Sequence, residues 1–145
     1  MASALTEKMK ITKVLDYTSA NTGTTNTASV DMAGYESVVF LTSFGTAAAD
    51  NLMHVEQSSD DASSDAYADL EGSEVNAGGA SDEDQWIEII RPREQYVRAA
   101  VVRGTSSTIE AVWAIQYAAK SRPVDNTTTG TIAGHSLVSP AEGTK

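Results

Sequence analysis

Histidine is the residue type most often used for metal binding and acid–base chemistry, and this chain has two, His54 and His135. They lie in separate predicted elements, and no His-x-His or His-Glu-x-x-His pair is present. The usual ligand pairs of a zinc site are therefore lacking. We expect both histidines to lie on the surface or to pack against neighbours.

Motifs that mark nucleophilic catalysis or phosphate binding are also missing from the sequence. There is no Gly-x-Ser-x-Gly elbow, and no glycine-rich turn is followed by Lys and Ser or Thr. A Ser-His-Asp triad assembled from distant parts of the chain stays open, because spatial neighbours are not visible in a sequence. We predict no catalytic residue, no metal site and no cofactor, and we interpret the chain as a protein that is not an enzyme.

The acidic segment 60–69 is the best candidate for a calcium loop. Side chains stand at ligand positions 1, 3, 5 and 9 of a twelve-residue loop, namely Asp61, Ser63, Asp65 and Asp69. The turn position holds Ala66 instead of Gly, and the last position holds Gly72 instead of the bidentate Glu. We therefore predict that the segment is a solvated acidic loop.

The elements that position these side chains are predicted to be strands. Alternating apolar and polar residues, rich in β-branched and aromatic types, indicate strands at 35–43, 51–57, 86–90, 95–103 and 109–118. Weaker strands are predicted at 10–15, 29–32, 67–70 and 131–138. A helix over 109–120 is the alternative there because Ala is frequent. The spacing of two between Trp113, Ile115 and Tyr117 favours the strand.

Turn-forming residues separate these strands and indicate an all-β fold. A hairpin loop is predicted at 103–107, and polar loops are predicted at 58–65 and 76–84. We expect a jelly-roll-like β-sandwich of about eight strands. An immunoglobulin-like sandwich, with Trp113 as its core aromatic residue, is the alternative. The predicted organisation is a flexible N-terminal arm at 1–9, a sandwich domain at 10–122 and a flexible C-terminal arm at 123–145.

Charge is unevenly distributed along the chain, whose net charge is −10. Residues 14–90 contain fifteen acidic residues and no Lys or Arg, whereas both flanking segments are net positive. A surface without cations repels phosphates, so we predict no nucleic-acid partner.

No apolar run is long enough to span a membrane, so we predict no membrane partner. The chain has no Cys, which excludes a disulfide scaffold.

Several segments together resemble a known family. Gly34–Phe40 opens a central strand, Val55–Asp61 and Gln95–Ala99 follow, and Ile109–Tyr117 is a last hydrophobic strand. This order, with the ending Ser139–Thr144, resembles the head decoration, or capsid cement, proteins of tailed bacteriophages.

The resemblance implies a β-sandwich that binds the outer surface of the capsid as a homotrimer and stabilises the shell. Its implied partners are the major capsid protein and further copies of this chain, with no small-molecule substrate. The implied location is the virion, after assembly in the bacterial cytoplasm. A virion module of the tail, the head–tail connector or a receptor-binding adhesin stays an alternative. A small carbohydrate- or calcium-binding domain is a third.

The capsid and trimer contacts are expected from the cation-bearing ends of the chain. Arg is favoured at interfaces because its planar fork pairs with carboxylates and its stem packs on apolar surface. The candidate contact residues are Lys8, Lys10, Lys13, Arg91, Arg93, Arg122, His135 and Lys145. The acidic segments 58–69 and 71–84 are expected to face solvent.

Overall fold

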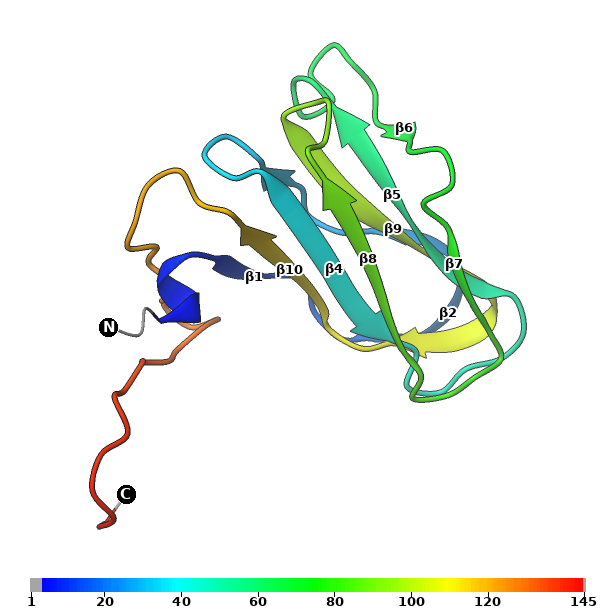
Figure 1. Cartoon of the computed structure of the whole chain (residues 1–145). Helices are drawn as coiled ribbons and strands as arrows, with labels where there is room; N and C mark the ends of the chain where they lie inside the picture. Colours follow the sequence, from blue (N-terminus) through cyan, green and yellow to red (C-terminus); the bar gives the residue numbers. More distant parts are fainter. Residues whose placement is uncertain (1–3, 145) are drawn as a thin grey trace.

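Two antiparallel β-sheets pack face to face in the computed structural model, which describes residues 4–144 (Figure 1). The four-stranded sheet has the order β1 (Lys10–Leu15), β10 (Val112–Tyr117), β4 (Ser37–Ser43) and β8 (Asp84–Ile90). The six-stranded sheet is built around the order β2 (Thr18–Asn26), β9 (Tyr96–Ile109), β5 (Asn51–Ser58) and β6 (Ala68–Asp69). In it, β3 (Val30–Asp31) pairs with β9, and β7 (Val75–Gly78) pairs with β5. A single helical turn, η1 (Leu5–Glu7), precedes β1.

The predicted all-β sandwich is confirmed, and its strand order is consistent with a jelly roll. The alternative helix over 109–120 is wrong, because Ile109 ends β9 and β10 begins after a two-residue connection. The predicted weaker strands at 10–15, 29–32 and 67–70 correspond to β1, β3 and β6.

The core lies between the sheets and is made of medium-sized apolar side chains. Fully buried examples are Val38, Phe40, Met53, Val55, Val97, Val101, Ile109 and Val112. On β10 the inward set is Val112, Ala114 and Gln116, so Trp113 points the other way. Trp113 as a core aromatic residue is therefore wrong.

The hairpin loop predicted at 103–107 is also wrong, because β9 continues through it to Ile109. Gly104 is required here by a close approach of backbones rather than by a turn. A Cβ atom at Gly104 would lie 2.4 Å from Asp50 Cβ and 2.6 Å from the Asp50 carbonyl oxygen. β2 pairs with both halves of β9, and the register between the two strands shifts near Asn21 and Gly23.

Two strands lie in segments where none was predicted, and one predicted strand is missing. β2 consists entirely of Ser, Thr, Asn, Ala and Gly, and β7 lies partly in the predicted loop at 76–84. Ala77 of β7 is buried, which ties this segment to the core. The strand predicted at 131–138 is wrong, since the described residues there form only an isolated bridge between Thr128 and Ile132.

The two ends of the chain, which the sequence treats as separate arms, contact one another beside β1 (Figure 1). The Asn126 side-chain amide donates to the carbonyl oxygens of Thr6 at 2.7 Å and Met9 at 2.9 Å. Its oxygen accepts from the Ile11 N–H at 2.7 Å. The Val124 N–H also donates to the Glu7 carbonyl oxygen at 3.0 Å. Asn126 thus joins both ends to the edge of the four-stranded sheet.

Replacing Asn126 with Ala should loosen both ends. Each lost hydrogen bond typically contributes about 1 kcal/mol, so local opening should become easier. We expect trypsin to cleave after Lys8 and Lys10 several-fold faster in this variant. An Asn76→Ala variant, which alters an exposed amide of β7, should keep the original cleavage rate. Equal rates in the Asn126 variant would show that this side chain does not hold the ends.

Candidate functional site

The outward side of the four-stranded sheet is unusually apolar. Its apolar members come from all four strands and are Ile11, Val39, Leu41, Trp86, Ile90, Trp113, Ile115 and Tyr117. We call this surface the outer apolar face. Trp86 is 62% exposed and Ile90 is 65% exposed, although large apolar side chains are usually covered. A monomer therefore leaves a broad apolar surface in water.

Strand register sets how the side chains of the outer apolar face line up in rows, because cross-strand partners lie on the same side of a sheet. One row runs from Lys13 on β1 through Trp113 and Leu41 to Trp86 on β8. The next row runs from Ile11 through Ile115 and Val39 to Glu88. The β1 flank of the face thus carries a cation, whereas the β8 flank carries a carboxylate.

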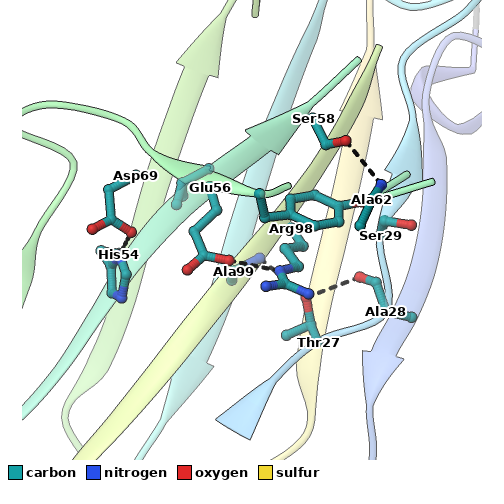
Figure 2. A network of polar contacts seen from close by, with 12 residues as sticks. Thr27, Ala28, Ser29, His54, Glu56, Ser58, Ala62, Asp69, Arg98 and Ala99 are labelled. Atoms are coloured by element: carbon teal, nitrogen blue, oxygen red, sulfur yellow. Dashed lines mark hydrogen bonds and ion pairs between the residues drawn. The ribbon is translucent and has the colours of Figure 1, made fainter. Parts of the chain in front are cut away.

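The outward side of the six-stranded sheet differs, since its polar groups bind one another (Figure 2). Arg98 Nε lies 2.6 Å from the Glu56 carboxylate, and the Arg98 guanidinium stacks 3.9 Å above the Tyr67 ring. His54 Nδ1 lies 3.1 Å from Asp69 Oδ1. These contacts pair Arg98 with Glu56 and His54 with Asp69 within the chain.

His54, Glu56 and Asp69 bring one ligand atom each to within 4.8 Å of one another, the only such group in the part of the chain described. The sequence did not indicate this group, because Asp69 reaches it through the pairing of β6 with β5. A divalent cation here would have to compete with the Arg98 guanidinium for Glu56. His54 itself is half-buried on β5 and contacts Asp69.

The carboxylates of the acidic segment 60–69 bind their own loop. Asp60 accepts from the backbone N–H groups of Ser64 at 2.8 Å and Asp65 at 3.0 Å. Asp65 accepts from the N–H and hydroxyl of Ser59, and these bonds lower the Asp65 pKa. The carboxylates therefore act as caps of the turn.

Asp61 makes a further link, from the loop to Tyr67 and Ser29. Its Oδ1 accepts hydrogen bonds from both hydroxyls, and these bonds lower the Asp61 pKa. Burial, followed by the bond to Asp61, raises the Tyr67 pKa to about 12. The segment is thus ordered by hydrogen bonds within the protein.

Calcium should leave the stability of this loop unchanged. Because the carboxylates already accept from N–H and O–H donors, binding a cation would cost several hydrogen bonds. We expect the same thermal midpoint, within a degree, in excess calcium and in excess chelator, as monitored by circular dichroism. A rise of several degrees in calcium would contradict both the sequence interpretation and this geometry.

Four of the expected contact residues lie at one end of the sandwich. Backbone hydrogen bonds link their segments in series: Arg91 N–H to Glu36 O at 2.9 Å, Lys120 N–H to Gly34 O at 2.9 Å, and Ala119 N–H to Lys8 O at 3.3 Å. A hollow of about 410 Å³ lies between these loops and is lined by Arg91, Arg93 and Lys120 with Glu36 and Glu94. We call this region the basic end; its cations are Lys8, Arg91, Arg93, Lys120 and Arg122.

The other expected contact residues are placed elsewhere. Lys10 and Lys13 lie on the edge strand β1. His135 lines a hollow of about 330 Å³ between the two ends of the chain, and Lys145 lies outside the described residues. Of the expected contact residues that the structure describes, those at the basic end therefore lie together, whereas Lys10, Lys13 and His135 lie apart from them.

Comparison with protein-family models, curated proteins and solved structures gave no match. Over residues 4–144, no helix has the length and apolar character needed to cross a membrane. The function is therefore inferred from the outer apolar face and the basic end.

Proposed function

We propose that this protein is a non-catalytic structural protein of a bacteriophage virion. It binds the outer surface of the capsid as a homotrimer, with the major capsid protein as its partner, and stabilises the shell. The observation that best supports this proposal is the basic end. Its five cations come from three segments that are distant in sequence, and four of them were expected as contact residues.

The charge distribution suits such a role. The guanidinium groups of Arg91 and Arg93 are exposed and can pair with carboxylates of a partner in a bidentate manner. A standard specific interface buries about 800 Å² on each partner, which is comparable to one end of a small sandwich. The acidic segment 14–90 would keep crowded neighbouring copies apart and soluble.

Binding to empty shells tests the role of the basic end. We would co-sediment the full chain with capsids assembled from the major capsid protein of the same genome. An Arg91→Gln/Arg93→Gln variant should bind at least tenfold more weakly. A Thr22→Glu/Ser106→Glu variant, whose net charge falls by the same two units at exposed positions of the six-stranded sheet, should bind normally. Absence of binding by the original chain would contradict the proposal, as would equal binding by both variants.

Copy number in purified virions separates this proposal from the alternative virion roles. A cement protein should approach the copy number of the major capsid protein, because it occupies equivalent sites all over the shell. Quantitative mass spectrometry of particles measures that ratio. A few copies per particle would instead favour a tail, connector or adhesin module.

A further inference from the structure

We infer that the outer apolar face is the surface through which copies of this chain associate. The inference rests on the proposed homotrimer and assigns its interface. Contiguous exposed apolar surface on a soluble protein commonly marks an interaction site. Here it includes Trp86 and Trp113, which flank Leu41 in one row across the sheet. Trp is the residue type most enriched among energetically dominant interface positions.

Charge at the two flanks identifies a second copy as the occupant. Lys13 stands on the β1 flank, whereas Glu88 and Asp84 stand on the β8 flank. Lys13 already contacts the Asp16 carboxylate at 2.6 Å, but Asp16 is 81% exposed and the pair is weak. Glu88 accepts from the Tyr117 hydroxyl and remains exposed. A surface with opposite charges at opposite flanks is complementary to itself when the β1 flank of one copy meets the β8 flank of another.

A threefold arrangement satisfies this requirement. If three copies turn their outer apolar faces toward a common axis along the strands, each β8 flank lies beside the next β1 flank. The same heterologous contact is then made three times and the ring closes. The apolar rows face the axis, and each Lys13 approaches a neighbouring Glu88.

Contact through side chains is favoured over extension of one sheet into the next. β1 and β8 are both edge strands. Along β1, however, the Ile11 N–H is already bonded to Asn126. A strand from another copy cannot use that donor, so the copies meet across the face.

Light scattering on the full chain is the first test. We expect a mass of three chains of 15.3 kDa at micromolar concentration. A Trp86→Ser variant should fall to the mass of one chain while keeping the β-sheet circular dichroism spectrum. A Leu137→Ser variant is the matched control, since Leu137 is 68% exposed but lies on the C-terminal tail. A monomeric original chain, or a Trp86→Ser variant with unchanged mass, would overturn the inference.

A charge exchange tests the flank-to-flank order. Lys13→Glu or Glu88→Lys alone places like charges together and should weaken association at least tenfold. The double variant restores opposite charges between copies and should recover most of that loss. No recovery in the double variant would overturn the proposed order of flanks.

The capsid-binding assay separates failure of this inference from failure of the proposed function. A trimer that does not bind shells would contradict the capsid role and leave the interface assignment standing. If the original chain is monomeric and Trp86→Ser abolishes binding to shells, the face is occupied by the capsid protein. That result would overturn the inference and leave the capsid role standing.

Discussion

Replacement of Phe40 with Ala should lower the free energy of unfolding by about 3–5 kcal/mol, the usual cost of removing a buried aromatic ring. Phe40 is fully buried on β4, with β10 on one side and β8 on the other. Its cross-strand neighbours are Ala114 and Ile87. Because Ala114 is small, its side chain cannot fill the cavity. The loss is comparable to the total stability of many small domains, so a large unfolded fraction is expected.

Urea denaturation at fixed protein concentration measures the loss, since association would otherwise change apparent stability. Phe40→Leu, which keeps most of the volume, should cost about 1.5 kcal/mol or less. Val102→Ala is a control at a half-buried position on the outward side of β9 and should cost less than Phe40→Ala. A loss below 1 kcal/mol in the Phe40→Ala variant would mean that the sheets repack around the gap.

Arg103→Met should release β2 from the six-stranded sheet. Arg103 is only 3% exposed, and its guanidinium reaches from β9 toward β2. Nη1 donates to the Ser19 carbonyl oxygen at 2.9 Å and to the Ser107 carbonyl oxygen at 3.3 Å, and Nη2 donates to Thr25 Oγ1 at 2.9 Å. Met keeps the apolar stem but leaves these oxygens without donors. We expect a loss of about 2–3 kcal/mol, because buried groups without partners cost about 1–3 kcal/mol.

Hydrogen exchange provides a local readout for the Arg103 prediction. Amides of β2 should exchange at least tenfold faster in the Arg103→Met variant, whereas amides of β4 should change only as global stability does. Arg103→Lys should recover little, since one ammonium cannot reproduce the planar fork that reaches both Ser19 and Thr25. Unchanged protection of β2 would show that backbone pairing alone holds this strand.

The sequence alone was sufficient to predict the fold class and the strands that carry their own apolar pattern. β4, β5 and β8 were predicted from alternation or from β-branched and aromatic runs bounded by turn residues. The acidic segment lacks the Gly and Glu of a standard calcium loop, so its interpretation as a solvated loop also rests on residue types alone. These inferences depend on local residue types, which a sequence displays directly.

Other features depend on tertiary pairing. β2 has no apolar alternation, and it becomes a strand because β9 and Arg103 supply its hydrogen-bond partners. The sequence around Gly104 is typical of a turn. In the structure, Gly104 instead allows β9 to pass close to Asp50. The basic end likewise exists only because loops that are distant in sequence meet.

The side of β10 that enters the core was decided by space between the sheets. Both alternating sets of this strand are largely apolar, so periodicity alone cannot choose between Val112 and Ala114 on one side and Trp113 and Ile115 on the other. Ala114 lies beside Phe40 in register, and a small side chain there leaves room for the buried ring. Packing therefore turns the larger Trp113 outward, where it joins the apolar face to which we assign self-association.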